Sequence, residues 1–172
     1  MDDPQFELES RRDIYRAIDT SPGVHFRELL RRLDYAQGTV QYHLRWLADH
    51  DLVESEADGD YTRYYPAKEF APEDKATLSA LRRTYSRELI AHLAAAGPLT
   101  TSELAERVEK SGSTVSWHLS HLHDVDLVEK HREGRRVEYA LSDRDRVLKL
   151  YATYEESFTD RVLDNVLDIW SG

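Results

Sequence analysis

The sequence predicts a mainly helical α+β fold in which one small domain, made of helices followed by a β-hairpin, occurs twice. Three observations support it: an internal repeat at an offset of 75 positions, a change from helical to strand-like periodicity within each copy, and a long apolar stripe near the C-terminus. We expect the first domain over residues 1–70, a connecting helix over 71–85, the second domain over 86–141 and a long C-terminal helix over 142–172.

The repeat is clearest where TVQYHLRWLADHDLVE at 39–54 aligns without gaps with TVSWHLSHLHDVDLVE at 114–129. The same alignment pairs further identical residues outside this core: Glu28 with Glu103, Gly59 with Gly134, and Tyr64 with Tyr139. Self-similarity at one fixed offset is the signature of a duplicated structural unit. The chain is therefore predicted to contain two copies of one domain.

The first helix of each copy is predicted from apolar residues four positions apart. Ile14 and Ile18 have this spacing in copy one, and Leu89 and Leu93 have it in copy two. Residues four apart lie on one side of a helix, so one face is expected to be buried. Ser10 is expected to cap the helix of copy one.

A short second helix follows a break in each copy, at Ser21-Pro22-Gly23 and at Gly97-Pro98. In copy two, Thr100 and Glu103 match a capping box. His25 takes the place of Thr100 in copy one, which predicts a weaker cap there.

A third helix is expected to start near Ala36 and near Ser111. Its apolar stripe consists of Val40, Leu44 and Leu47 in copy one and of Val115, Leu119 and Leu122 in copy two. Both copies then change to strand-like sequence around Asp58-Gly59 and Glu133-Gly134, dipeptides that suit tight hairpin turns. The tyrosines near the first turn are expected to pack around that hairpin: Tyr61, Tyr64 and Tyr65.

The pattern T-V-x-x-H-L-x-x-L, followed by L-V-E, a glycine-tipped hairpin and a closing Tyr, resembles the ArsR and MarR group of winged helix-turn-helix regulators. Two copies in one short acidic chain resemble the tandem winged-helix regulators of halophilic archaea. The resemblance implies a sequence-specific transcription regulator that binds double-stranded DNA. In such domains the third helix enters the major groove, the second braces it, and the hairpin, or wing, reaches the backbone or the minor groove.

Composition limits the other possibilities. With no cysteine, the chain forms no disulfide and no thiolate metal site. No apolar run approaches the roughly 20 residues that cross a bilayer, and the acidic start has no signal-peptide core, so we expect a soluble, cytoplasmic protein without a membrane partner.

The net charge of -10 opposes phosphate binding. A halophilic solvent would explain this charge, and an ordinary acidic protein is the alternative.

If the resemblance holds, the exposed face of each third helix contacts base edges and nearby cations contact phosphates. The predicted residues of copy one are Gln37, Thr39, Gln41, Tyr42 and Arg45 on the third helix, Arg27, Arg31 and Arg32 on the second, and Arg63 in the wing. Those of copy two are Ser111, Ser113, Thr114, Ser116, Trp117 and Ser120 on the third helix, and Lys130, His131, Arg132, Arg135 and Arg136 in the wing. The first wing is otherwise mostly acidic, so copy one is expected to bind mainly through helices and copy two through its wing.

Metal binding and catalysis are both disfavoured. His118, His121, His123 and His131 invite a metal site because imidazole is a common ligand, but His123 cannot share the helical face of the first two. His118 and its counterpart His43 are expected to pack or to cap. No nucleophile motif, phosphate-binding glycine loop or convincing carboxylate pair occurs, so we expect neither an enzyme nor a cofactor.

The segments outside the two copies are predicted to be helical. Pro72-Glu73-Asp74 suits a helix start, and the apolar spacing then continues into copy two, which favours one long connecting helix. Ser142 and Asp145 match a capping box for the last helix. Its apolar stripe is too long for one small domain to cover: Val147, Leu150, Tyr151, Tyr154, Phe158, Val162, Val166, Leu167 and Trp170. We expect a homodimer seam there, or alternatively a helix that folds back over copy two or the connector.

A second class of function stays open at this stage. Winged helices also bind proteins, and an acidic first wing would suit an adaptor of the transcription machinery.

Overall fold

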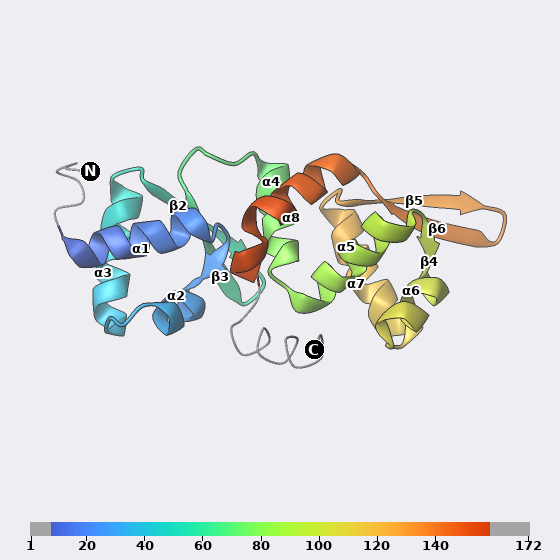
Figure 1. The fold of residues 1–172 in the computed structure, drawn as a ribbon, viewed down its shortest axis with the longest axis horizontal. Helices are drawn as coiled ribbons and strands as arrows, with labels where there is room; N and C mark the ends of the chain where they lie inside the picture. Colours follow the sequence, from blue (N-terminus) through green and yellow to red (C-terminus); the bar gives the residue numbers. More distant parts are fainter. Residues whose placement is uncertain (1–7, 159–172) are drawn as a thin grey trace. The chain divides into compact units, whose positions relative to one another are not determined.

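The computed structural model describes residues 8–158 of the chain. The chain divides into two compact units, Met1–Lys75 and Ala76–Gly172, which are described separately below as unit 1 and unit 2. Both units combine helices with a small antiparallel sheet, so the predicted α+β class is confirmed (Figure 1). No helix in the described part of the chain has the length and apolar character that crossing a membrane requires.

Unit 1 contains, in chain order, α1 (Glu9–Thr20), β1 (Val24–His25), α2 (Phe26–Arg32), α3 (Gln37–Asp49), β2 (Val53–Asp58) and β3 (Tyr61–Pro66). Its sheet has the order β1-β3-β2, with both pairs antiparallel. The predicted apolar stripes meet in one core, because Ile14 and Ile18 of α1 pack with Val40, Leu44 and Leu47 of α3. The core holds α3 with its opposite face in solvent.

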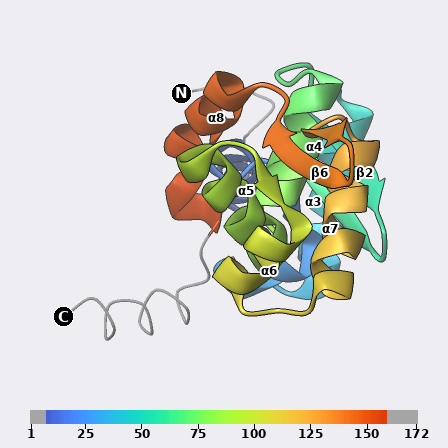
Figure 2. The same cartoon turned by 90° about the vertical axis from the view of Figure 1, so that its right-hand side faces the viewer.

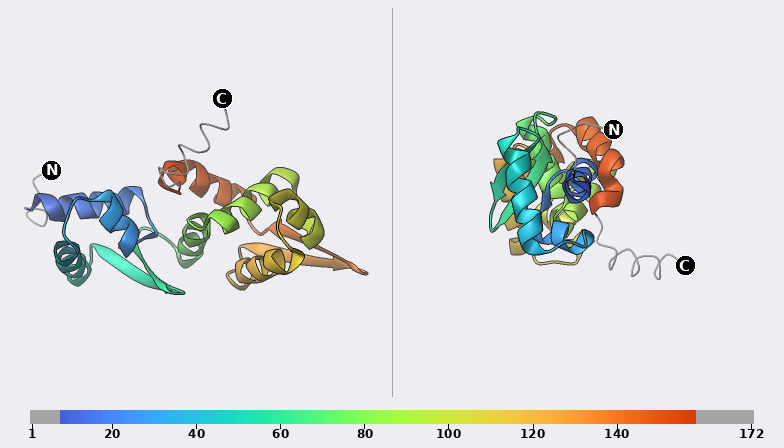
Figure 3. Two further views of the ribbon diagram at one scale, coloured as in Figure 1. Left: turned by 90° about the horizontal axis from the view of Figure 1, so that it is seen from below. Right: turned by 90° about the vertical axis from the view of Figure 1, so that its left-hand side faces the viewer.

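Unit 2 repeats this order with α5 (Thr84–Ala96), β4 (Leu99–Thr100), α6 (Thr101–Val108), α7 (Gly112–Asp124), β5 (Val128–Glu133) and β6 (Arg136–Leu141). Its sheet has the order β4-β6-β5. The helices α6 and α7 pack against each other, as Figure 2 shows. The hairpins β2–β3 and β5–β6 each project from the helices of their own unit (Figure 3).

The repeated Asp-Leu-Val-Glu has a structural cause at the end of α3 and of α7. Asp51 and Asp126 have φ angles of 56° and 58°, in the left-handed region. Aspartate is enriched there among residues with a side chain. The next amide closes the helix end in each unit, from Leu52 to the carbonyl of Leu47 (2.9 Å) and from Leu127 to that of Leu122 (2.9 Å). The chain thus turns from the third helix into the hairpin in the same way twice.

Both hairpin turns have the predicted glycine. Asp58 pairs with Tyr61 and Glu133 with Arg136, which leaves two loop residues in each hairpin. The first loop residue is Gly59 (φ 60°) or Gly134 (φ 61°). A glycine with positive φ at this position is the usual solution for a two-residue hairpin.

The caps of the second helices also follow the sequence. Thr100 and Glu103 form the predicted capping box, with Glu103 N donating to Thr100 Oγ1 (3.2 Å) and Thr100 N to Glu103 Oε2 (2.9 Å). His25 caps α2 through one bond, which its Nδ1 accepts from Glu28 N (3.2 Å).

Two other predicted caps are wrong. Ser10 lies inside α1, whose N-cap is Leu8, and its hydroxyl bonds to His43 Nε2 (2.8 Å). The last helix, α8 (Arg144–Phe158), begins later than predicted, and Asp143 rather than Ser142 caps it by accepting a bond from Arg146 N (3.2 Å). A tertiary contact takes the hydroxyl of Ser10, whereas at α8 a neighbouring local cap replaces the predicted one.

The single connecting helix is also wrong. The helix α4 (Pro72–Leu81), which crosses the boundary between the units, ends at Leu81, and α5 begins at Thr84 after an extended Arg83. Arg87 Nη1 donates to the Leu81 carbonyl (2.8 Å), so a side chain satisfies the acceptor that a continuous helix would have used. The apolar spacing continues through this break, which is why periodicity alone did not reveal it.

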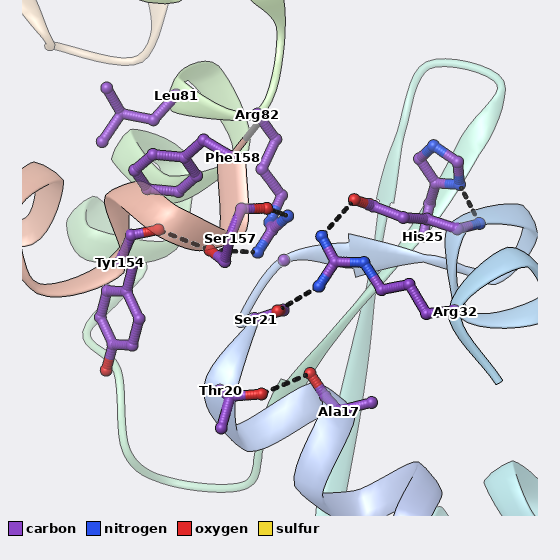
Figure 4. A network of polar contacts seen from close by, with 12 residues as sticks. Ala17, Thr20, Ser21, His25, Arg32, Leu81, Arg82, Tyr154, Ser157 and Phe158 are labelled. Carbon is purple, nitrogen blue, oxygen red and sulfur yellow. Dashed lines mark hydrogen bonds and ion pairs between the residues drawn. The ribbon is translucent and has the colours of Figure 1, made fainter. Parts of the chain in front are cut away.

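Within unit 2, α8 packs against α4 and α5. Arg82 donates to the Ser157 carbonyl (2.9 Å) and to the Ser157 hydroxyl (2.9 Å), as Figure 4 shows. Arg87 donates to the Phe158 carbonyl (3.1 Å), and Arg144 Nε to that of Ala94 (2.8 Å). Residues 144–158 therefore follow the fold-back alternative. The predicted apolar residues Val162, Val166, Leu167 and Trp170 lie outside the described residues.

Candidate nucleic-acid interface

The helix α3 presents a polar face opposite its buried stripe. Gln41 and Arg45 are exposed, whereas Val40, Leu44 and Leu47 are buried. Gln41 and Arg45 are four residues apart and lie side by side on the helix surface. These side-chain types form bidentate hydrogen bonds with adenine and guanine in the major groove, respectively.

A groove of about 910 Å³ lies between α2, α3 and the β2–β3 hairpin. Three of the predicted residues line it together: Arg27 of α2, and Gln41 and Arg45 of α3. Ser55 and Thr62 line it from the hairpin. The groove thus combines two cations, an amide and two hydroxyls with one carboxylate, Asp60. The cations, the amide and the hydroxyls are donors suited to phosphate oxygens and base edges, whereas Asp60 disfavours phosphate beside it.

The other predicted helix residues of unit 1 do not line this groove. Gln37 is exposed at the first residue of α3, Thr39 is half-buried, and Arg31 is exposed on α2. Tyr42 is 62% exposed.

Arg63, predicted from the sequence to contact phosphate, is instead buried, with 2% of its surface exposed. Its Nε donates to Asp58 (2.6 Å) and its Nη1 to the Gly23 carbonyl (2.9 Å), so the guanidinium joins β3 to the turn before β1. Arg32 is tied down as well. It pairs with Glu28 (2.7 Å) and donates to the Ser21 hydroxyl (Figure 4). Neither residue is positioned for phosphate in unit 1.

The acidic first wing is partly neutralised within unit 1, where Lys75 and Arg63 offset two of its four carboxylate charges. Lys75, only 9% exposed, forms ion pairs with Glu54 and with Glu56 (3.1 Å). Burial alone would lower the pKa of Lys75, but its hydrogen bonds with these carboxylates raise it. Asp58 is paired with Arg63. Three acidic side chains of the wing therefore have a cationic partner, and the repulsion of phosphate expected from the sequence is reduced.

The exposed face of α7 carries hydroxyls in place of the cation and amide of α3. Ser116 and Ser120 stand at the positions of Gln41 and Arg45, and both are exposed. At the start of the helix, Ser111 is the N-cap and accepts a bond from Thr114 N (3.2 Å). Its hydroxyl also bonds to those of Thr114 (2.8 Å) and Ser113 (3.1 Å). The hydroxyls of Ser111, Ser113 and Thr114 thus form a hydrogen-bonded cluster at the N-cap of α7 and are also exposed to solvent.

The second wing has two chemically different faces. Residues directly opposite each other in an antiparallel pair share a face, so Lys130 with Tyr139 and Arg132 with Val137 define one face. At the equivalent pairs of the first wing, Ser55 with Tyr64 and Ala57 with Thr62, three of the four residues line the groove with α3. The cations Lys130 and Arg132 therefore occupy the face of the second wing that corresponds to the α3 side of the first wing.

The other predicted wing residues differ in their partners. Arg135 is exposed at the second loop position of the turn. Arg136 pairs with Glu138 (2.7 Å) and Glu103 (3.1 Å), and these bonds raise its pKa. His131 lies on the same face as Glu138 and pairs with Glu129 (3.2 Å). Lys130, Arg132 and Arg135 are thus the cations of this wing best placed for phosphate.

His43 and His118 occupy one position of the repeat and both pack against the first helix of their unit. His43 is 4% exposed and bonds to Ser10 and to Arg11 Nε (3.4 Å). Burial and the Arg11 charge lower the pKa of His43. His118 stacks on Tyr85 (4.5 Å between centroids), and burial with neighbouring charges lowers its pKa. The packing role predicted for both is confirmed.

No group of three or more His, Asp and Glu side chains among residues 8–158 is arranged to hold a metal ion. His121 Nδ1 instead bonds to the Trp117 carbonyl (2.9 Å).

Sequence reasoning missed part of the groove wall in unit 1. Tyr61 is 42% exposed, stacks on His25 (4.6 Å) and lines the groove, although it was expected to pack within the hairpin. Tyr65 does pack, at 1% exposure, with its hydroxyl donating to the Lys75 carbonyl (3.1 Å). The position of Tyr61 next to the turn could have predicted this exposure, because a residue at a strand end has neighbours on fewer sides.

Comparison with known families agrees with this geometry. A family model described as an N-terminal HTH domain matches residues 8–78. A second model, described as a helix-turn-helix domain, matches residues 85–131. Both halves match helix-turn-helix domains. The second and third helices of each unit, with α3 or α7 as the exposed one, lie within these matches.

Curated relatives carry the same description. Over 135 residues, the chain is 29% identical to an uncharacterized HTH-type transcriptional regulator, MJ1398, of the archaeon Methanocaldococcus jannaschii, which covers 78% of this chain and 34% of the relative. A 46-residue stretch is 44% identical to a second such regulator of that organism, MJ0774, covering 27% of this chain and 11% of the relative. The chain thus spans about a third or less of the relatives it matches. Both relatives are described as HTH-type transcriptional regulators.

Among solved structures, HlyU from Vibrio cholerae matches 51% of this chain and 97% of its own length, with 26% identity and a TM-score of 0.44. The transcriptional repressor BigR from Xylella fastidiosa is 22% identical, with a TM-score of 0.42 over 46% of this chain and 81% of that chain.

Proposed function

We propose that this protein is a sequence-specific, DNA-binding transcription regulator with two winged helix-turn-helix domains in each chain. The shared order of three helices and a hairpin in both units supports the tandem arrangement. The helix-turn-helix matches in both halves and the regulators among the relatives support DNA as the partner. Such a regulator acts on the genome, and we place it in the cytoplasm.

The observation that carries this proposal is the groove of unit 1. Arg27, Gln41 and Arg45 come from two helices and line one concave surface beside the wing. Surface side chains of these types usually face solvent independently of one another. Their convergence on one groove is what a protein needs to bind a phosphate backbone and the adjacent base edges together.

The two domains contribute differently in this proposal. Unit 1 binds through Arg27, Gln41 and Arg45 of its helices, whereas unit 2 binds phosphate through Lys130, Arg132 and Arg135 of its wing. The adaptor alternative rested on an acidic first wing. The pairing of Glu54 and Glu56 with Lys75 weakens that argument.

Selection of bound duplexes from a random-sequence DNA library, followed by affinity measurements over a range of salt, tests the proposal. Log affinity falls with log salt, and each lost phosphate contact should reduce the magnitude of this negative slope by about 0.9. Replacing Lys130, Arg132 and Arg135 with Ala should therefore reduce its magnitude by nearly three. Lys149→Ala, which removes an exposed lysine of α8, is the matched control and should leave the slope unchanged. If no duplex is enriched at any salt concentration, the adaptor becomes the better reading.

Homodimerisation through the C-terminal segment belongs to the same proposal. Residues 144–158 pack against α4 and α5 within unit 2, so removing them would damage that unit. A variant that ends at residue 158 is therefore the suitable test. We expect light scattering to show a dimer for the full chain and a monomer for this variant, and equal masses would contradict a seam in residues 159–172.

A halophilic setting is the proposed reason for the net charge of -10. Screening of repulsion among the acidic side chains should raise the melting temperature as KCl increases from dilute to molar concentrations. A melting temperature that stays constant or falls would point to an ordinary acidic protein.

A further inference from the structure

The two recognition helices share an unexpected apolar feature. Tyr42 on α3 and Trp117 on α7 occupy the same position of the repeat. They are 62% and 57% exposed, the highest values among the exposed large hydrophobic side chains of the described residues. Large aromatic side chains normally bury most of their surface, so an exposed one at the same place in both copies needs a cause.

Trp117 contacts His121, on the next turn of α7, at 4.0 Å between ring centroids. Each ring also contacts the histidine that follows it, Tyr42 with His43 edge-to-face at 5.3 Å and Trp117 with His118 at 4.9 Å with perpendicular rings. The first helix of each unit fixes these histidines in turn, through Ser10 in unit 1 and through Tyr85 in unit 2. The aromatic rings are thus pre-positioned on the helix surface, which lowers the entropy cost of using them as contacts.

The neighbours of each ring are the side chains proposed to contact bases. Tyr42 lies beside Gln41 and one turn before Arg45, and Trp117 lies beside Ser116 and one turn before Ser120. The helix α7 contains neither Lys nor Arg. Trp117 is therefore the largest group that α7 offers to a ligand on this face.

We infer that Tyr42 and Trp117 are specificity residues that contact the C5-methyl group of thymine in the major groove. This inference rests on the proposed function, and it adds the base that each recognition helix selects. Thymine is the base whose major-groove edge carries a methyl group, and apolar side chains recognise it by contact with that methyl. An exposed ring fixed on the helix surface provides such a contact without a hydrogen bond.

The DNA segments bound by the two recognition helices, here called half-sites, then share one feature and differ in another. Equivalent rings require a thymine at equivalent positions of both half-sites. The neighbouring bases differ, because Gln41 and Arg45 favour adenine and guanine whereas Ser116 and Ser120 accept several bases. The operator is expected to be two unequal half-sites, each with the same thymine.

The test uses the full chain and duplexes selected from a random-sequence library. Each conserved thymine is replaced by uracil, which removes only the methyl group. We expect about a fourfold weaker binding for each half-site thymine replaced, since that is the value of burying one methyl-sized group. Uracil at thymines outside the half-sites is the matched DNA control and should leave the affinity unchanged.

Protein variants then identify the contacting ring. In Tyr42→Ala and Trp117→Ala the preference for thymine over uracil should disappear in the corresponding half-site only, whereas Tyr42→Phe and Trp117→Phe should keep it. Both positions are exposed, so melting temperatures close to that of the unmodified chain are expected and should be checked. A duplex with 5-iodouracil at the same position should crosslink on irradiation to Trp117 or Tyr42, located by mass spectrometry.

The outcomes separate this inference from the proposed function. Enriched duplexes with equal affinity for thymine and uracil, or a preference that survives in the alanine variants, would overturn the inference and leave DNA binding intact. If no duplex is enriched, both fail, and the exposed rings become candidates for a protein contact.

Discussion

Unit 1 and unit 2 build the same order of elements from one repeated sequence, yet they place their charges on different elements. Unit 1 has Arg27 and Arg45 on its helices, where unit 2 has Ser102 and Ser120. Unit 2 has Lys130 and Arg132 on the hairpin face where unit 1 has Ser55 and Ala57. The repeated residues are those that close helices and fill cores, whereas the exchanged residues lie on the surface, where sequence can change without cost to the fold.

Arg63 of unit 1 and Glu138 of unit 2 occupy equivalent positions of the repeat, and we expect the largest difference in stability between the units when they are replaced. Arg63→Ala should lower the free energy of unfolding by about 3 kcal/mol, because it removes a buried guanidinium and leaves the Gly23 carbonyl without that donor. Glu138→Ala should cost less than about 1 kcal/mol, since its ion pair with Arg136 lies at the surface. Urea denaturation of the full chain measures both. Equal losses would contradict a structural role peculiar to Arg63.

The features that the sequence predicted well are local ones. The hairpin turns, the Thr100–Glu103 box and the apolar stripe of α3 each depend on residues close in the chain. Strand alternation could also have predicted that Arg63 is buried, because it shares the face of Tyr65. Attention to its charge alone suggested a phosphate contact instead.

Several features that the sequence missed depend on partners far along the chain, whereas the break after Leu81 is closed by a residue only six positions away. Ser10 looks like a helix cap but bonds to His43, 33 positions away. Lys75 offsets part of the negative charge of the first wing, through ion pairs with Glu54 and Glu56. The break after Leu81 is satisfied by Arg87, and its apolar spacing resembles an unbroken helix. The groove itself required Arg27 and Arg45 to converge from two helices, which no spacing rule specifies.

Positions 45 and 120 provide the second contrast, in base selection. Arg45→Ala should cost about 2 kcal/mol, or roughly 30-fold in affinity, at a duplex that carries the preferred guanine, because a bidentate contact is lost. Ser120→Ala should change affinity by less than about threefold. Binding to matched duplexes that differ at one base pair measures both effects. An Arg45→Ala loss that is the same for every base would show a phosphate contact instead of base recognition.

The second-helix caps provide a smaller contrast. Thr100→Ala should lower the free energy of unfolding by about 1 kcal/mol, because the bond from Glu103 N to the Thr100 hydroxyl is lost, while the backbone bond from residue 100 to Glu103 can remain. His25→Thr should raise it by about 0.5 kcal/mol, since Glu28 stands where Glu103 completes the box in unit 2. Thermal unfolding monitored by circular dichroism detects both changes. A destabilised His25→Thr would show that the stacking of His25 on Tyr61 contributes more than its cap.

His43 and His118, at equivalent positions of the two units, give the smallest expected effect on stability, and both units should show it. The folded protein lowers the pKa of His43 and of His118 below the ordinary value of 6.5. Below about pH 6.5 the unfolded chain therefore binds more protons at these positions, so the free energy of unfolding falls as the pH drops, and above that pH the two groups have little influence. Between pH 7.5 and pH 6 the loss should stay under about 0.8 kcal/mol for each histidine.

Substitution by glutamine tests this shared effect, because glutamine keeps a hydrogen-bonding side chain without titrating near neutral pH. Each of His43→Gln and His118→Gln should reduce the pH dependence of unfolding, and the double variant should reduce it by the sum, since the two sites lie in separate units. A double variant with the pH dependence of the original chain would show that acid acts elsewhere. A reduction from one substitution alone would show that the repeated histidine, identical in sequence, is held neutral in only one of the two units.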